Sequence, residues 1–211
     1  MIGIVDYGMG NLFSVSKALE RINIPYIISD SPEELGKMKG LILPGVGAFK
    51  DAMVLLKEKK LDQFLHTYVD SGRPLLGICL GMQLLFQESE ENGLHQGLGL
   101  LKGRVTRIPA ELNGESVKVP HMGWNKLTFN QHSPVLHDIE EGFVYFVHSY
   151  YVSEMKEQDL IASSTYNVTI PAVVGEGKVF GMQFHPEKSS KVGMQLLTNF
   201  ANAMEQSEAI L

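Results

Sequence analysis

The sequence is short of cysteine, of basic side chains and of long apolar runs. Its 211 residues contain one cysteine, Cys79, so no internal disulfide can form and a reducing compartment is expected. The net charge of −6, with Lys and Arg scattered, argues against a nucleic-acid-binding surface. The longest apolar run, Pro74 to Phe86, is too short to span a bilayer, and no secretory signal is visible. These absences predict a cytoplasmic protein that binds neither membrane nor nucleic acid.

The first half of the chain alternates apolar strand patterns with helical ones. Hydrophobic residues make up 44% of the sequence, which is enough for a substantial core, and the length most simply fits one domain, residues 1–211. Strands are expected at 1–5, 25–29, 40–43 and 74–79, each followed by a helix. Asn11 should cap the first helix, and Ser31 with Glu34 should form a capping box on the second. The pattern predicts an α/β fold with a doubly wound, mostly parallel sheet flanked by helices.

The second half reads differently, and predicts a mixed or antiparallel extension of the sheet. Short alternating segments replace the helical periodicity between Glu88 and Glu141. Residues 143–152 form the clearest strand pattern, and a hairpin is expected around 175–177. The segment 120–125 is interpreted as a loop, whose Trp124 either fills the core or lies at a surface contact, the latter being favoured. A helix closes the chain, and the acidic stretch after Phe200 is interpreted as its solvated end.

The stretch around Cys79 has the pattern of a nucleophile elbow. An apolar strand ends at Cys79, a helical pattern begins at once, and Gly77 and Gly81 lie two residues to either side. The turn is too tight for flanking side chains, and glycine tolerates strained backbone angles. The helix N-terminus would favour the thiolate of Cys79. A lone cysteine is otherwise most often a buried, inert hydrophobe, so a catalytic role needs a base as well.

The base is expected at His185. This residue precedes Pro186, which favours an extended backbone, and in an extended segment Glu187 lies on the same face as His185. A carboxylate that hydrogen-bonds the ring would supply the orienting half of a catalytic triad. A metal site is the alternative for this pair, but it lacks a third ligand at recognisable spacing, so no metal is expected.

Two glycine-containing loops could serve the same edge of the sheet. Gly45, Val46 and Gly47 follow the third strand, and their backbone N–H groups, with that of Leu80, are candidates for an oxyanion hole. An ordinary strand-to-helix turn would leave the same pattern. A loop at 6–11 contains two of the three glycines of a dinucleotide-binding fingerprint. Phe13 occupies the place of the third, so no cofactor is expected.

With these motifs in hand, the sequence resembles the class I (triad) glutamine amidotransferases. The segments 77–83 and 184–189 carry the resemblance to the family. The segments 6–11, 44–49, 120–125 and 147–151 resemble the branch whose glutaminase subunits pass ammonia to a separate (β/α)₈-barrel cyclase subunit in histidine biosynthesis. No departure occurs at a position that matches the family's catalytic residues.

The resemblance implies a role for each motif. Cys79 would attack the side-chain amide of L-glutamine, His185 would transfer protons and Glu187 would orient its ring. The resemblance places substrate contacts at Gln83, His148, Ser149 and Tyr150, and interface residues at Trp124, Asn125, Tyr145 and Lys188. It also implies a cyclase partner, and a glutaminase held inactive by the 44–47 loop until that partner docks. The remaining alternatives are an anthranilate-synthase-type glutaminase subunit and a free-standing cysteine γ-glutamyl hydrolase.

Overall fold

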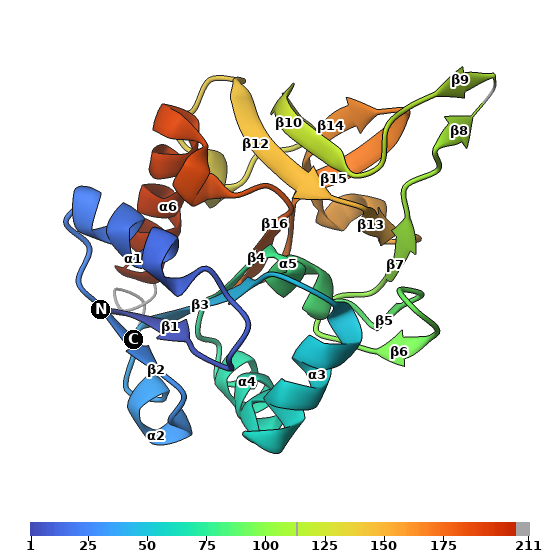
Figure 1. Cartoon of the computed structure of the whole chain (residues 1–211). Helices are drawn as coiled ribbons and strands as arrows, with labels where there is room; N and C mark the ends of the chain where they lie inside the picture. Colours follow the sequence, from blue (N-terminus) through green and yellow to red (C-terminus); the bar gives the residue numbers. More distant parts are fainter. Residues whose placement is uncertain (113, 206–211) are drawn as a thin grey trace.

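The computed structural model describes residues 1–112 and 114–205, and in this part of the chain an eight-stranded sheet forms the centre of the molecule (Figure 1). The strand order is β11-β14-β15-β16-β4-β3-β1-β2. The parallel half consists of β1 (Ile2–Val5), β2 (Tyr26–Ser29), β3 (Gly40–Gly45), β4 (Leu75–Cys79) and β16 (Val179–Met182). The antiparallel half adds β15 (Val168–Glu176), β14 (Leu160–Tyr166) and β11 (Thr128–Phe129). The predicted fold class, including its antiparallel extension, is therefore confirmed.

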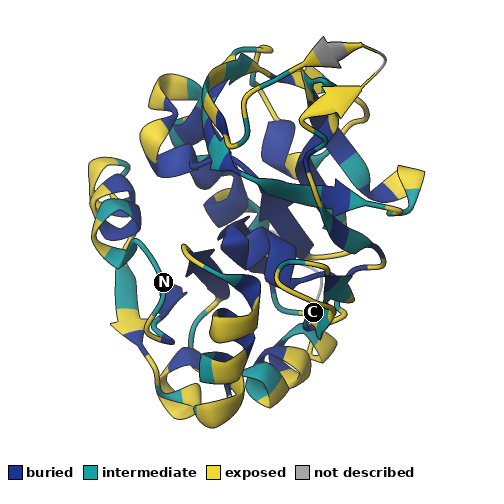
Figure 2. Cartoon of the chain, turned by 45° about the vertical axis from the view of Figure 1, so that its right-hand side comes forward, coloured by how far each residue is buried: buried dark blue, intermediate teal, exposed yellow. Residues whose placement is uncertain are grey.

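Helices cover both faces of the parallel half. They are α1 (Leu12–Arg21), α2 (Pro32–Leu35), α3 (Phe49–Glu58), α4 (Leu61–Asp70), α5 (Leu80–Leu84) and α6 (Ser190–Glu205). Ile2 and Ile4 of β1 pack in one buried cluster with side chains of α1 and α6. Val5 points the other way, into a second cluster with side chains of α3 and α4. This alternation follows from the two-residue period of a strand, and it buries the central strands completely (Figure 2).

The helix caps follow the sequence with one exception. The side chain of Asn11 accepts the N–H of Ser14 and so caps α1 as predicted. The hydroxyl of Ser31 likewise accepts the N–H of Glu34 at the start of α2. The reciprocal contact of the capping box is absent, because the Glu34 carboxylate accepts the hydroxyl of Ser29 and Ser29 accepts the N–H of Ser31. The Ser29 hydroxyl therefore links the Glu34 carboxylate to the N–H of Ser31 in place of the direct contact that was predicted.

The middle of the chain builds smaller sheets beside the central one. A four-stranded sheet within the described residues contains β13 (Tyr150–Ser153), β7 (Arg104–Arg107), β5 (Glu88–Ser89) and β6 (His95–Gln96). Two antiparallel pairs are β10 (His121–Lys126) with β12 (Phe143–His148), and β8 (Glu111–Leu112) with β9 (Glu115–Ser116). Three short 3₁₀ turns in the described chain are η1 (Pro134–Leu136), η2 (Glu157–Asp159) and η3 (Pro186–Lys188).

Two local predictions in the second half are wrong. The segment 120–125 is mostly the strand β10, because its backbone pairs with β12 from residue 121 onwards. The single strand expected at 143–152 is interrupted at Ser149, and its halves β12 and β13 pair in different sheets. The expected hairpin is present as β15 and β16, and its turn lies at 177–178 because Glu176 still pairs with Val179. The end of the chain at 206–211, where a solvated helix end was expected, lies outside the described residues.

Candidate active site

Cys79 ends β4 in the middle of the sheet, and its own backbone carries the strain of the elbow. Its φ of 55° and ψ of −114° lie outside the regions that side chains prefer, at a cost of about 1–3 kcal/mol. The helix α5 begins at the next residue, Leu80. The sequence suggested that glycine would supply the strained angles, whereas the structure places them at the cysteine. Strand, strained cysteine and helix make the geometry of a nucleophile elbow.

Gly77 and Gly81 are needed for space rather than for unusual angles. Neither has a positive φ. A Cβ on Gly77 would lie 2.6 Å from the carbonyl oxygen of Gly81, and a Cβ on Gly81 would lie 1.8 Å from the carbonyl oxygen of Leu43. The first close approach is between the end of β4 and the start of α5, and the second is between α5 and β3. A side chain at Gly77 would push α5 away from β4, and a side chain at Gly81 would push α5 away from β3.

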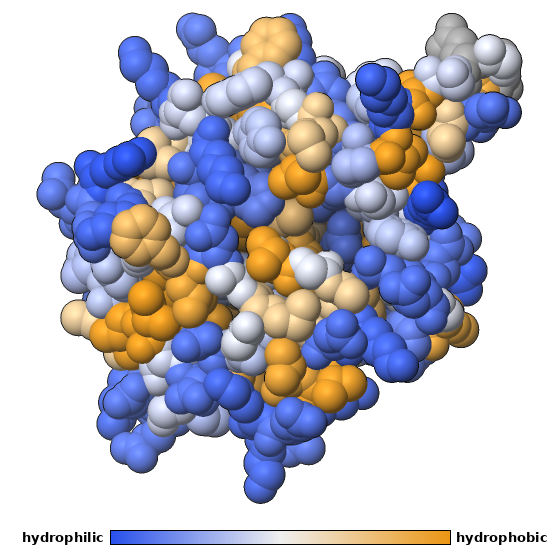
Figure 3. Space-filling model, in the orientation of Figure 1, coloured by the Kyte–Doolittle hydropathy of each residue, from blue (hydrophilic) through white to orange (hydrophobic). Residues whose placement is uncertain are grey.

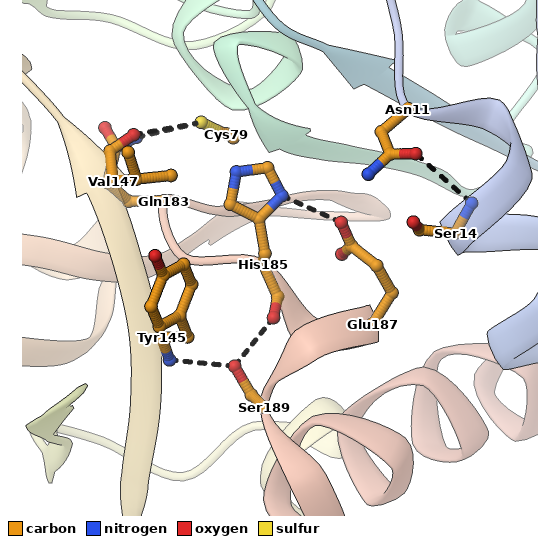
Figure 4. A network of polar contacts seen from close by, with 9 residues as sticks. All are labelled: Asn11, Ser14, Cys79, Tyr145, Val147, Gln183, His185, Glu187 and Ser189. Atoms are coloured by element: carbon orange, nitrogen blue, oxygen red, sulfur yellow. Dashed lines mark hydrogen bonds and ion pairs between the residues drawn. The ribbon is translucent and has the colours of Figure 1, made fainter. Parts of the chain in front are cut away.

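His185 lies with its ring between Cys79 and Glu187 (Figure 4). Its Nδ1 is 2.8 Å from Oε1 of Glu187, and both side chains are almost fully buried. The predicted contact is therefore present, but its predicted cause is wrong. Glu187 lies in the 3₁₀ turn η3 rather than in an extended segment, and this turn brings the carboxylate back towards the ring.

The backbone of His185 is anchored to β12. Its N–H donates to the carbonyl oxygen of Tyr145 at 3.0 Å. The hydroxyl of Ser189 donates to the carbonyl oxygen of His185 at 2.6 Å and accepts the N–H of Tyr145 at 2.9 Å (Figure 4). Three hydrogen bonds among His185, Tyr145 and Ser189 thus fix the backbone of the candidate base, and with it the direction of the ring.

The charges around His185 favour its protonated form. Burial alone would lower the pKa of His185, but hydrogen bonds and charge attraction from Cys79 and Glu187 outweigh it and raise the pKa to about 10. A protonated imidazole beside a candidate cysteine nucleophile suits acid–base chemistry at the sulfur. The helix dipole, which the sequence suggested as the source of thiolate stabilisation, has less to contribute because α5 has only five residues.

A pocket of about 430 Å³ brings most of the predicted site residues together. Its lining consists of Val46, Gly47, Cys79, Leu80, Gln83, Glu91, Pro120, Val147, His148, Ser149, Tyr150 and His185. Nucleophile, base, three of the oxyanion candidates and all four substrate-binding candidates therefore face one space. Their catalytic and binding roles stay predictions. A larger, more open cavity of about 1370 Å³ lies between residues 129–139 and α6, and it contains none of the candidate residues.

Gly45, the fourth oxyanion candidate, does not line this pocket and lies at the end of β3. A Cβ at Gly45 would lie 2.7 Å from the N–H nitrogen of Gly81 and 2.8 Å from the hydroxyl oxygen of Tyr7. The Tyr7 hydroxyl is buried without a hydrogen-bond partner. Burial, and then the negative charge of Cys79, raise the pKa of Tyr7, so the phenol stays protonated. Close packing at Gly45 keeps the loop next to the elbow.

The amide of Gln83 has a fixed orientation. Its Nε2 donates to the carbonyl oxygen of Tyr150 and to Oε1 of Gln183, both at 3.0 Å. Because the nitrogen side is used, the oxygen side of the Gln83 amide is the part that can accept from a ligand in the pocket. Glu91 adds a carboxylate to the same lining, and its Oε2 accepts the N–H of Phe49.

The interface candidates occupy one area but differ in exposure. Trp124 is 52% exposed, which excludes the core-filling alternative, and its ring meets the edge of Tyr145 directly opposite on β12. Lys188 is exposed as well. Asn125 differs, because its Nδ2 donates to the carbonyl oxygen of Thr165 at 2.9 Å. Asn125 is thus engaged within the chain.

Sequence reasoning missed four residues of the site. Gln183 and Ser189 belong to the motif around His185, and their burial beside it was the missing information. Tyr7 lies two residues after the end of β1, where strand-end loops of a parallel sheet converge. No sequence motif points to Glu91, which lies in the connection after β5 and reaches the pocket only through the folding of the chain. Within residues 1–112 and 114–205, no three His, Cys, Asp or Glu side chains group as a metal site, and no helix is long and apolar enough to cross a membrane.

The chain is similar in sequence to known glutamine amidotransferases. The sequence model of the Glutamine amidotransferase class-I family matches residues 3–204. The chain is 62% identical over 208 residues to the imidazole glycerol phosphate synthase subunit HisH of Bacillus velezensis, covering 98% of both chains. The subunit of the same name from Bacillus subtilis (strain 168) is 61% identical over 208 residues, again covering 98% of both.

Solved structures show the same fold at lower identity. A crystal structure of a glutamine amidotransferase superposes with a TM-score of 0.76 at 21% identity, covering 97% of this chain and 98% of that one. The structure of PurLQS from Thermotoga maritima gives a TM-score of 0.72 at 21% identity, covering 96% and 98%. At this identity the likeness concerns the fold alone.

Proposed function

The chain belongs to the class-I glutamine amidotransferase family, and from that premise we propose that it is the glutaminase subunit of an imidazole glycerol phosphate synthase. Two curated subunits of that enzyme are more than 60% identical to it over nearly their full lengths. We propose further that residues 1–211 are a single glutamine amidotransferase domain, which the match over residues 3–204 supports. A cytoplasmic location is part of the proposal, because the one cysteine suits a reducing compartment.

The observation that carries the proposal is the position of the His185 ring between Cys79 and Glu187. The thiolate of Cys79 attacks the side-chain amide carbon of L-glutamine and forms a tetrahedral intermediate. His185, already protonated, gives its proton to the leaving ammonia. The neutral ring then removes a proton from water, which releases glutamate from the thioester. Glu187 holds the ring in place throughout.

The oxyanion of the tetrahedral intermediate needs N–H donors next to the sulfur. Leu80 directly follows the nucleophile, and Val46 and Gly47 line the same pocket from the neighbouring strand end. Gly45 packs against the elbow and sets the start of this loop. We assign the backbone N–H of Leu80 and one N–H of the 45–47 loop as the donors. The loop would supply its donor only after the partner subunit has docked.

The substrate's amino-acid end is recognised on the opposite wall. The free oxygen of the Gln83 amide and the carboxylate of Glu91 suit the α-ammonium group of glutamine. The backbone at His148, Ser149 and Tyr150 is assigned to the α-amino and α-carboxylate groups. This division places the side-chain amide of glutamine towards Cys79.

The released ammonia must pass to a second subunit, and the surface beside the pocket offers an apolar docking face. Met122, Trp124 and Phe143 are exposed on β10 and β12, and Val147 of the same ribbon lines the pocket. In the space-filling view, apolar side chains gather around a hollow at the centre of this face (Figure 3). We propose that a (β/α)₈-barrel cyclase covers it, with Trp124, Tyr145 and Lys188 in the interface, and uses the ammonia to form imidazole glycerol phosphate.

The test is to mix the chain with a cyclase barrel and to measure glutamate release with and without the acceptor nucleotide. We expect strong stimulation by the complex. Cys79→Ala should abolish the glutamine-dependent synthesis while the complex still uses added ammonia. Equal glutamine turnover without a cyclase would indicate a free-standing hydrolase instead. Stimulation by an anthranilate synthase subunit, but not by the cyclase, would indicate the sister branch.

A further inference from the structure

Two buried histidines touch each other beneath the β10–β12 ribbon. His121 and His148 lie directly opposite in the antiparallel register, and they are 2% and 6% exposed. The Nδ1 of His121 is 3.0 Å from the Nε2 of His148. The His121 ring is stacked between the rings of Phe146 and Tyr166, with centroids 4.6 and 4.0 Å away. Neither the fold nor the proposed chemistry so far explains this pair.

The hydrogen-bond partners determine where the protons lie. The Nδ1 of His148 is 2.8 Å from the carbonyl oxygen of Tyr150, and because a carbonyl can only accept, this nitrogen carries the proton. In a neutral ring the Nε2 of His148 is then an acceptor, so the Nδ1 of His121 must be the donor. That leaves the Nε2 of His121 as an acceptor, and it faces the Nδ2 of Asn125 at 3.3 Å.

Two independent observations support this assignment. The amide of Asn125 is oriented by its other contacts, since its Nδ2 donates to Thr165 and its Oδ1 accepts the N–H of Lys126. Both rings are neutral, because burial lowers the pKa of His121 to about 4 and, together with the nearby His121 and His185, lowers the pKa of His148 to about 3. Each ring therefore carries one proton, and each proton points towards the pocket.

The chain of donors ends on a wall of the active site. The Tyr150 carbonyl that accepts from His148 also accepts from the Nε2 of Gln83. Gln83 donates to Gln183 as well, and the Nε2 of Gln183 is 4.0 Å from the sulfur of Cys79. The Tyr150 carbonyl thus accepts hydrogen bonds from both His148 and Gln83, and it connects the histidine pair to the amide that is proposed to bind the substrate.

We propose that His121 is a positioning residue for glutamine binding: its Nδ1 proton locks the His148 ring, and the ring holds the Tyr150 carbonyl and the Gln83 amide in their binding orientation. This inference rests on the proposed function, since it concerns the affinity of that same pocket. Without the donor, the buried Nε2 of His148 has no partner, and the ring can exchange tautomers or turn. The Tyr150 carbonyl then loses one of its two fixed donors. His121 itself touches no reacting atom.

The competing explanation is that His121 only fills space between two aromatic rings. Two substitutions separate the explanations in the complex with the cyclase. His121→Phe keeps the aromatic stack and removes the donor, whereas His121→Asn removes the stack and keeps an amide N–H near the place of Nδ1. We expect His121→Phe to raise KM for glutamine by about tenfold, the size of one hydrogen bond, with kcat within about twofold. His121→Asn should recover most of that loss.

Tyr166→Phe is the matched control. It keeps the ring that stacks on His121 and removes a hydroxyl that donates to Lys118, outside the donor chain. Its KM should equal that of the unchanged protein. An unchanged KM in His121→Phe, or equal losses in His121→Phe and His121→Asn, would overturn the positioning role in favour of packing.

A spectroscopic readout keeps the inference testable even where a variant folds poorly. In the unchanged complex with ¹⁵N-labelled histidine, both rings should show the neutral form protonated at Nδ1, which is the rarer tautomer of free histidine. An Nε2-protonated ring at either position would overturn the donor chain. A wild-type complex without glutaminase activity would instead refute the proposed function, while an active one with an unaffected His121→Phe variant would refute the role of His121 alone.

Discussion

The backbone of Gly81 lies so close to Leu43 that a Cβ at Gly81 would be 1.8 Å from the carbonyl oxygen of Leu43. This contact joins the first turn of α5 to β3, the strand that leads into the candidate oxyanion loop at 45–47. The nucleophile and the candidate oxyanion donors are therefore held together by backbone against backbone. No rotamer change can relieve such a contact.

Gly81→Ala should therefore cost more than an ordinary glycine substitution. We expect a loss of about 3 kcal/mol or more in the free energy of unfolding, because a methyl group would force α5 away from β3. Gly177→Ala is the control, since Gly177 has a left-handed φ of 61° but nothing within 4 Å of its Cβ position. It should cost only about 1–2 kcal/mol. Urea unfolding of both variants compares them, and equal losses would refute the steric argument.

Glu187→Gln tests the orienting carboxylate. The amide keeps the size of the side chain but removes the charge that faces Nδ1 of His185. We expect kcat/KM for glutamine in the complex to fall by at least about a hundredfold, the scale of losing a well-placed acid–base group. Binding of the cyclase should be unchanged, because Glu187 is buried. A variant that retains activity would mean that the backbone anchors of His185 suffice to orient it.

Much of this site could be predicted from local sequence because its geometry is local. The elbow needs glycine two residues to either side of Cys79, and His185 and Glu187 are separated by one residue, so both motifs are visible in a few positions. The parallel half of the sheet was predictable for a similar reason. Its central strands are buried on both faces and appear as continuous apolar runs, such as Leu75–Cys79.

What could not be predicted depends on pairing between distant segments. Nothing local shows that the strand pattern at 143–152 changes sheet at Ser149, because both halves are equally suited to strands. The contact between His121 and His148 follows from the register of β10 against β12, which no short window contains. Glu91 reaches the pocket for the same long-range reason.

The titration of His185 should separate the contributions of its two neighbours. Burial lowers the pKa of His185, but hydrogen bonds and charge attraction from Cys79 and Glu187 outweigh it and raise the pKa from 6.5 to about 10. Removing either partner should therefore lower the pKa, so the ring in Cys79→Ala and in Glu187→Gln should titrate at lower pH than in the unchanged protein. NMR titration of the ring in the three proteins measures both contributions. A wild-type pKa near 6.5 would show that no imidazolium–thiolate pair exists.

The buried histidine pair predicts a loss of stability in acid. His121 and His148 have pKa values lowered from 6.5 to about 4 and about 3, mainly by burial. Between these values and 6.5 the unfolded chain binds more protons than the native one, so the free energy of unfolding falls as the pH falls. Each histidine contributes up to about 1.4 kcal/mol per pH unit in its window. Urea unfolding between pH 4 and 7 should show a shallower slope for His121→Phe than for the unchanged protein.

Trp124→Ala tests the proposed docking face. The indole is 52% exposed and rests edge-on against Tyr145, so it offers a large, pre-positioned apolar surface beside the pocket. Aromatic anchors of this kind dominate interfaces, and we expect the Kd for the cyclase to rise roughly thirtyfold or more, about 2 kcal/mol.

Leu94→Ala is the matched control, because Leu94 is 61% exposed and lies between β5 and β6 rather than on β10 or β12. Titration calorimetry should show normal affinity for that variant. Since Trp124 is outside the pocket lining, glutaminase activity of Trp124→Ala should return at saturating cyclase. Equal affinities of the two variants for the cyclase would show that Trp124 does not lie in the interface.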